Sequence, residues 1–135
     1  MKFQDITAGA LGLLLLLAGS YLTELLVSLE TDRHTFPFIA SWALVLIAVI
    51  GVVPGVVIGW LSKNYPLLIA IVLGLFFGIY EQGTLYSDTL KEHADKADII
   101  GSPSISDYIA SGVAKTIYLC AFASLGVSLR TRLAR

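Results

Sequence analysis

Residues 66 to 86 read PLLIAIVLGLFFGIYEQGTLY, an apolar run that begins at a proline and carries no charge before Glu81. A helix rises about 1.5 Å per residue, so this run is long enough to cross the ~30 Å hydrocarbon core of a bilayer. Proline suits the first helical position, because the first N–H groups of a helix have no partner within it. The run is predicted to be a transmembrane helix that begins at Pro66.

Three further apolar segments of similar length flank this one. They run from about residue 6 to 29, from 38 to 61 and from 108 to 129. Backbone polar groups in lipid must be hydrogen-bonded within the segment, so these segments are expected to be helices. The chain, residues 1–135, is therefore predicted to be a single all-α membrane domain, a four-helix transmembrane bundle.

The composition supports a membrane protein and excludes other classes. Hydrophobic residues make up 56% of the chain, charged residues only 14%, and the mean hydropathy is +0.81. A small water-soluble domain needs more polar surface than this. The net charge of −1 gives no basic surface for nucleic acid.

The first apolar segment has a second interpretation, a cleaved signal peptide. Ala18, Gly19 and Ser20 form an acceptable small-residue cleavage site. However, the apolar run continues to Leu29, and the leader MKFQD carries one lysine beside an aspartate. A retained helix is the favoured prediction.

The loop charges predict the orientation. The basic residues near the two ends and in the loop after the second helix outnumber those of the other loops: Lys2, Lys63, Arg130, Arg132 and Arg135 against Arg33, Lys91 and Lys96. Cytoplasmic loops carry the excess of Lys and Arg. Both termini are therefore predicted to be cytoplasmic, in a multi-pass protein of the cytoplasmic (inner) membrane.

The outer loop between the third and fourth helices, residues 87–107, is predicted to contain a short amphipathic helix. Thr89 and Glu92 have the spacing of a capping box, and Glu92 with Lys96 is a favourable i,i+4 pair. Such a helix would be either a docking surface or a solvated connector.

Small residues predict where the helices pack, because they let backbones approach closely in lipid. Glycines recur at every fourth position, namely Gly51, Gly55 and Gly59 in the second helix and Gly74 and Gly78 in the third. These rows are expected to pack within one chain or between copies of it. Pro54, in the middle of the second helix, is predicted to kink it.

Three charged residues lie inside the predicted spans, at a similar depth in the outer leaflet: Glu24, Glu81 and Lys115. Intramembrane ionisable residues usually face protein and pair. Glu81 is the expected partner of Lys115, because their helices are consecutive and antiparallel. A lysine can also extend its side chain to the interface, so this polar cluster is interpreted as either structural or functional.

No motif indicates catalysis, since HExxH, GxSxG, the phosphate loop and CxxC do not occur in the sequence. We expect no enzyme activity, no cofactor and no metal. Two functional classes remain. One is an accessory, assembly or immunity-type partner of another membrane protein, or of a second copy of itself. The other is a small oligomeric proton-coupled transporter that uses the outer-leaflet glutamates.

In size and helix number the chain is similar to the small multidrug transporters. The resemblance implies an essential glutamate in the middle of the first helix, where this chain has an unbroken run from Leu13 to Leu17. The long outer loop also departs from their short connections. The interaction class is therefore the leading prediction.

The orientation predicts which residues react from outside the cell. In a Cys120→Ser background, Ser102→Cys should be labelled by a membrane-impermeant thiol reagent in intact cells, whereas a cysteine added at the C-terminus should be protected. The reverse labelling pattern would show that both termini are outside the cell.

Overall fold

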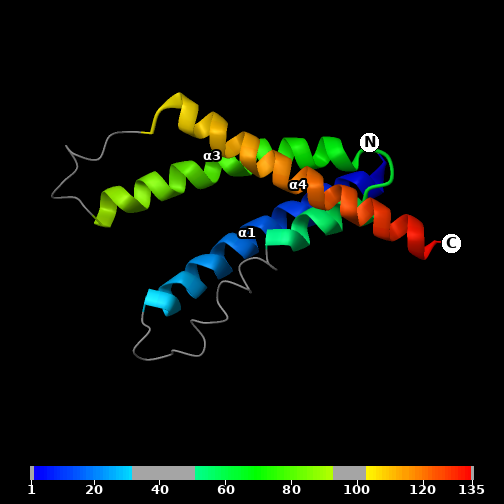
Figure 1. The fold of residues 1–135 in the computed structure, drawn as a ribbon, viewed down its shortest axis with the longest axis horizontal. Helices are drawn as coiled ribbons and strands as arrows, with labels where there is room; N and C mark the ends of the chain where they lie inside the picture. Colours follow the sequence, from blue (N-terminus) through cyan, green and yellow to red (C-terminus); the bar gives the residue numbers. More distant parts are fainter. Residues whose placement is uncertain (1, 32–50, 93–102, 135) are drawn as a thin grey trace.

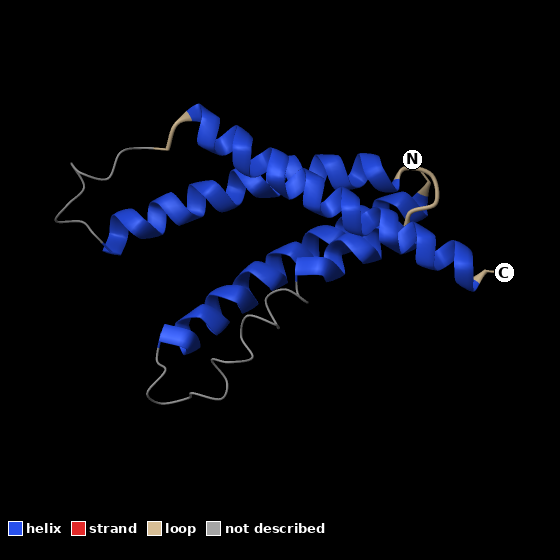
Figure 2. Ribbon diagram, viewed as in Figure 1, coloured by secondary structure: helices blue, strands red, loops and turns tan. Residues whose placement is uncertain are grey.

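The computed structural model describes residues 2–31, 51–92 and 103–134, and every regular element in these ranges is an α-helix (Figure 2). The helices are α1 (Phe3–Thr31), a shorter helix at Gly51–Leu61, α3 (Pro66–Glu92) and α4 (Ile105–Leu133). α1, α3 and α4 are each long and apolar enough to cross a membrane. The all-α prediction is confirmed, while residues 38–50 of the predicted second span lie outside the described residues.

The long helices extend beyond the predicted spans. α3 begins at Pro66 but continues through Thr89 to Glu92, so the prediction that a separate helix begins at Thr89 is wrong. Extending an existing helix adds a hydrogen bond per residue without a new nucleation cost, which favours continuation over a break. The remaining part of the predicted amphipathic helix, residues 93–97, lies outside the described residues.

α4 begins at Ile105, three residues before the predicted start, because a capping box precedes it. The Ser104 hydroxyl accepts a hydrogen bond from the Asp107 N–H, and the Asp107 carboxylate accepts one from the Ser104 N–H at 2.8 Å. Two N–H groups that would otherwise lack partners are thereby satisfied. The predicted outer loop of residues 87–107 is therefore too long at both ends.

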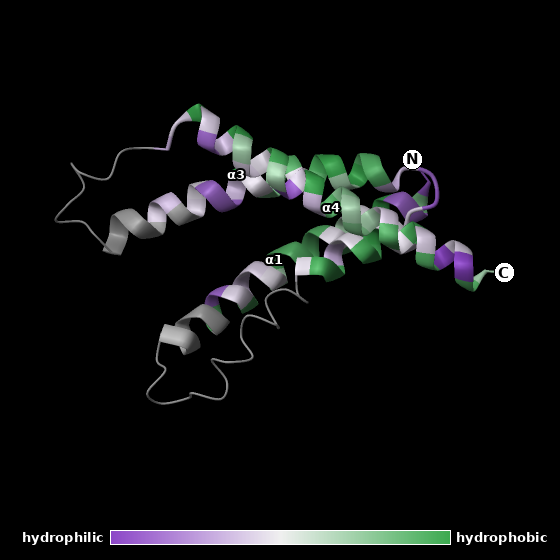
Figure 3. Ribbon diagram, viewed as in Figure 1, coloured by the Kyte–Doolittle hydropathy of each residue, from purple (hydrophilic) through white to green (hydrophobic). Residues whose placement is uncertain are grey.

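The helices converge at one end of the molecule and spread apart at the other (Figure 1). α3 and α4 pack along each other, while α1 contacts α3. Both termini lie at the converging end, where hydrophilic residues also gather (Figure 3). We call this end the terminal end, and the other the open end.

The buried core is small and draws on every described helix. Its members are Ala8, Leu16, Ile58, Ile69, Ala70, Phe77, Leu119 and Ala123. Large apolar side chains elsewhere on the three long helices remain exposed, including Leu14, Phe76 and Ile117. An apolar surface of this extent suits contact with lipid.

The glycines of the Gly51–Leu61 helix bring its backbone against α4. A Cβ atom on Gly55 would lie 2.6 Å from Cβ of Phe122, and one on Gly59 would overlap the backbone carbonyl of Ala123. From the other side, a Cβ on Gly126 of α4 would overlap the carbonyl of Val56. These two helices can pack this closely only because the three positions carry no side chain.

The glycines of α3 also face α4. A Cβ on Gly74 would lie 2.5 Å from Cα of Thr116, and one on Gly78 would lie 2.6 Å from the carbonyl oxygen of Ser111. The glycine rows therefore contact α4 of the same chain. Pro54 is fully buried, but the residues before Gly51 lie outside the described part of the chain, so the kink stays a prediction.

Alanine substitutions at two helical glycines should separate packing from helix propensity. Gly59→Ala and Gly83→Ala both gain up to about 1 kcal/mol of helix propensity. Only at Gly59 does the new methyl group meet backbone, whereas nothing lies within 4 Å of a Cβ on Gly83. Overpacking costs about 1–3 kcal/mol, so Gly59→Ala should lower the melting temperature in detergent while Gly83→Ala should not. Equal melting temperatures would contradict the close approach of the two backbones.

Candidate functional site

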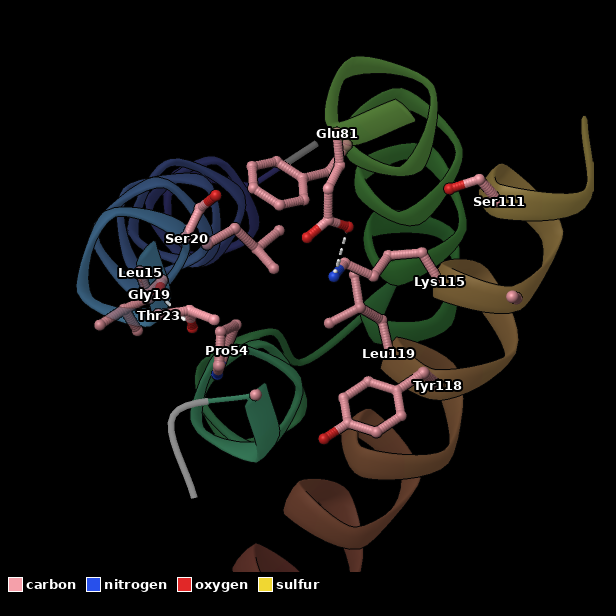
Figure 4. A pocket seen from close by; sticks show the side chains of 14 residues that line it. Leu15, Gly19, Ser20, Thr23, Pro54, Glu81, Ser111, Lys115, Tyr118 and Leu119 are labelled. Atoms are coloured by element: carbon pink, nitrogen blue, oxygen red, sulfur yellow. Dashed lines mark hydrogen bonds and ion pairs between the residues drawn. The ribbon is translucent and has the colours of Figure 1, made fainter. Parts of the chain in front are cut away.

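An ion pair joins α3 to α4 on the side of the bundle that spreads open. Lys115 Nζ lies 2.8 Å from Glu81 Oε2, and the two side chains are 27% and 35% exposed (Figure 4). Gly78 of α3 lies against Ser111 of α4. Because the two helices are antiparallel, Glu81 starts almost one turn from this contact in one direction, and Lys115 starts one turn from it in the other. Their long side chains bridge the distance between the two backbone positions.

Neighbouring groups anchor the ion pair on both helices. Lys115 Nζ lies 5.4 Å from the centre of the Phe77 ring, within the range of a cation–π contact. The Ser111 hydroxyl donates a hydrogen bond of 2.9 Å to the Gly78 carbonyl oxygen, which links the two backbones one turn away. The ammonium group is therefore held over an aromatic face as well as beside a carboxylate.

The ion pair lines a cavity of about 470 Å³ between α1, the Gly51–Leu61 helix, α3 and α4 (Figure 4). Its apolar walls are formed by Leu15, Leu16, Pro54, Phe77 and Leu119, and its hydroxyl groups come from Ser20, Thr23, Ser111 and Tyr118. This volume falls in the range of small-molecule sites, roughly 300–1,000 Å³. We call this space the ion-pair cavity.

The ion-pair cavity offers binding groups of both signs. Lys115 has three N–H donors, and its ion pair with Glu81 leaves donors available for a ligand. Within the described residues, no hydrogen bond or ion pair engages the second carboxylate oxygen of Glu81, Oε1. A ligand in the cavity can therefore contact a hydrogen-bond donor and an acceptor side by side, and the ion pair that supplies them has no net charge.

Glu24 lies apart from this ion pair. Its side chain is exposed on α1 and is not among the described residues that line the ion-pair cavity. α1 instead directs Ser20 and Thr23 toward the cavity, with the Thr23 hydroxyl bonded to the Gly19 carbonyl oxygen at 2.8 Å. The structure thus brings together Glu81 and Lys115 and leaves the third member of the predicted cluster on another surface.

A second polar site, which the sequence did not indicate, lies at the terminal end. The Asp5 carboxylate is fully buried and accepts hydrogen bonds from the Ser62 hydroxyl at 2.7 Å and the Asn64 side-chain amide at 3.0 Å. The backbone N–H groups of Asn64 and Lys2 also donate to it, at 3.3 and 3.2 Å. Four donors compensate the carboxylate for its lost hydration. We call Asp5, Ser62 and Asn64 the Asp5 network.

Arg130 of α4 extends this connection. Its guanidinium donates to the carbonyl oxygens of Trp60 and Ser62, at 3.1 and 2.5 Å. The last carbonyls of a helix lack partners within it and carry partial negative charge, so a cation there is favourable. Arg130 thus caps the Gly51–Leu61 helix, and Ser62 links it to Asp5. In the sequence, Asp5 is a single acid five residues from the start, and nothing near it reveals that its partners lie about sixty residues away.

Neither similarity to other proteins nor a metal site in the described residues assigns a function to this chain. Comparison with protein-family models, with curated proteins and with solved structures finds no match. Within residues 2–31, 51–92 and 103–134, no group of three or more His, Cys, Asp or Glu side chains is placed to hold a metal ion. His34 and His93 lie outside these ranges.

The ion pair makes a measurable prediction for stability. Lys115→Met and Glu81→Gln should each lower the free energy of unfolding in detergent, because each leaves one charge in the ion-pair cavity without its partner. The double variant should lose less than the sum of the two. Polar couplings inside membranes average about 0.6 kcal/mol and reach about 1.7 kcal/mol.

The matched control for this cycle is Glu24→Gln, which removes a carboxylate that the structure leaves apart from Lys115. Its effect should add to that of Lys115→Met without coupling. Strict additivity between Lys115 and Glu81 would show that their contact contributes nothing to the fold.

Proposed function

We propose that this chain is a small multi-pass protein of the cytoplasmic membrane that acts as an accessory, assembly or immunity-type partner of another membrane protein. Its role in this proposal is binding rather than catalysis. The contact surface is the exposed face of α1, and the bound element is a transmembrane helix of the partner.

Glu24 is the observation that carries this proposal. It lies inside the apolar span Phe3–Leu25, its side chain is exposed, and no other described residue gives it a hydrogen bond or an ion pair. Ionisable residues within a span are rare and almost always face protein or a water-filled space, where they pair. A partner helix with a basic or hydrogen-bond-donating group at this depth would pair with Glu24.

The spacing of the neighbouring exposed residues fits a helix partner. Ala10, Leu14, Leu17, Tyr21 and Glu24 are all exposed, and they follow one another at alternating intervals of four and three. This is the spacing of a seam against which a second helix packs. Tyr21, which is 69% exposed, lies beside Glu24 on this α1 seam and adds aromatic contact area.

A second candidate function, proton-coupled transport, is favoured by the ion-pair cavity. Protonation of Glu81 would remove the charge that holds Lys115, and the cavity gives both groups access to a substrate. In this alternative Glu81 is essential and Glu24 is dispensable.

Co-purification tests the proposal. We expect a stoichiometric partner to co-purify with the tagged wild-type protein from native membranes in mild detergent, and with Glu81→Gln. The yield of partner should fall with Glu24→Gln and be lost with Glu24→Lys, which places like charges together. A tagged protein that purifies alone as a stable homodimer would favour the transporter instead.

Site-specific photo-crosslinking shows whether the α1 seam itself is the contact. A photoreactive residue at Leu14 or Leu17 should link the same partner, while one at Phe76, an exposed apolar position on α3, should not. Equal crosslinking from α1 and α3 would indicate that the co-purified protein shares the micelle without binding to the seam.

A further inference from the structure

The ion-pair cavity lies between the helices, whereas the α1 seam is on the exposed side of α1. The identity of its occupant is therefore a separate question from the proposed function. The cavity has one pair of opposite charges, a set of hydroxyl groups and apolar walls on all four helices. A mixed lining of this kind suits an occupant with a polar part and an apolar part.

The depth of the ion pair indicates where the polar part of the occupant lies. Glu81 is the first charged residue of the apolar run that begins at Pro66, and it lies about 22 Å along the helix axis from that proline. In a hydrocarbon core of about 30 Å, Glu81 and the Lys115 ammonium beside it lie in the leaflet away from the termini. The polar part of a lipid of this leaflet lies on the same side of the bilayer midplane as the ion pair.

The charges of the ion pair indicate the chemistry of the polar part. Lys115 and Glu81 neutralise each other at 2.8 Å, so the cavity has no net attraction for a single charge. An anion that approached Lys115 would also approach the Glu81 carboxylate, and a cation that approached Glu81 would approach the Lys115 ammonium. A group that carries both charges avoids this conflict, because each of its charges meets the opposite one.

We propose that the ion-pair cavity binds a zwitterionic phospholipid with a primary ammonium group, of the phosphatidylethanolamine type. Its phosphate accepts hydrogen bonds from the free N–H groups of Lys115, and its ammonium donates to Glu81 Oε1. The existing bond between Lys115 and Glu81 Oε2 stays intact, because each side chain uses a group that the ion pair leaves free.

The remaining lining suits the apolar part of this lipid. Leu15 is a partly exposed apolar residue of the cavity lining, whereas Leu16, Phe77 and Leu119 are already buried in the core. The acyl chains of the lipid therefore extend from the cavity into the surrounding bilayer, away from water. The hydroxyls of Ser111 and Thr23 already donate to backbone carbonyls, so toward the lipid they offer acceptor oxygens, which suit its ammonium. A soluble zwitterion would gain the polar contacts but has no acyl chains to keep it in the bilayer.

Lipid retention measured by native mass spectrometry tests the proposal. The wild-type protein in detergent is mixed with equimolar phosphatidylethanolamine, phosphatidylcholine and phosphatidylglycerol of identical acyl chains. The lipids that stay bound are then measured after the detergent is removed in the mass spectrometer. We expect phosphatidylethanolamine to be retained over phosphatidylglycerol by roughly tenfold, the change that one charge-assisted hydrogen bond produces. Phosphatidylcholine should be intermediate, because its ammonium keeps the charge but has no N–H to donate. Equal retention of the three lipids by the wild type would overturn the proposal.

Two variants locate the preference in the ion-pair cavity. The double variant Glu81→Gln with Lys115→Met should retain the three lipids equally, and Glu24→Gln, which changes a residue outside the cavity lining, should keep the wild-type preference. The ratio among lipids is read out within one sample, so a loss of stability in the double variant does not affect it. A preserved preference in the double variant would place the lipid elsewhere.

A last arm distinguishes the lipid from its water-soluble head group. Excess glycerophosphoethanolamine should leave the bound phosphatidylethanolamine in place, because it lacks the acyl chains that keep the lipid in the detergent micelle beside the cavity. Full displacement would assign the cavity to a soluble zwitterion and reject the lipid. Neither outcome depends on a partner at the α1 seam, so this proposal and the proposed function can fail separately.

Discussion

Helices in lipid gain little from hiding apolar side chains, since the solvent around them is equally apolar, and they are held together by close packing instead. In this chain that requirement is met on α4. Gly55 and Gly59 on one side, and Gly74 and Gly78 on the other, place two helix backbones directly against it. The position of α4 then determines which of its residues face inward at the open end, and Lys115 is one of them.

Two sets of polar contacts add to the close packing at the glycines. At the terminal end the Asp5 network and Arg130 tie α1, the segment around residue 62 and α4 together. On the side of the open end, the ion pair of Glu81 and Lys115 links only α3 and α4. Within the described residues, the helices converge at the end that carries the Asp5 network and Arg130, and they spread apart toward the other end (Figure 1).

The sequence predicts the parts of this structure that depend on local pattern. Apolar runs identify the helices, and Pro66 marks the start of α3. The meeting of Glu81 with Lys115 follows from two consecutive antiparallel helices and similar depth. Other features depend on how helices rotate and on contacts far apart along the chain. The outward direction of Glu24 is set by the packing of α1, and the burial of Asp5 is set by Ser62 and Asn64. The function is still harder to predict from the sequence, because binding depends on which side chains the folded chain leaves exposed.

The Asp5 network also has a consequence for the order in which the protein is built. Asp5 is synthesised before the side chains that bond to it, since Ser62 follows it by 57 residues and Asn64 by 59, and Arg130 comes 68 residues after Ser62. The Asp5 carboxylate therefore lacks these two partners until the segment before α3 has been made. The carbonyls of Trp60 and Ser62 receive the Arg130 guanidinium only when α4 is nearly complete. A chain that ends before residue 130 lacks this cation, and the unpaired carbonyls at its terminal end distinguish it from a chain in which α4 is complete.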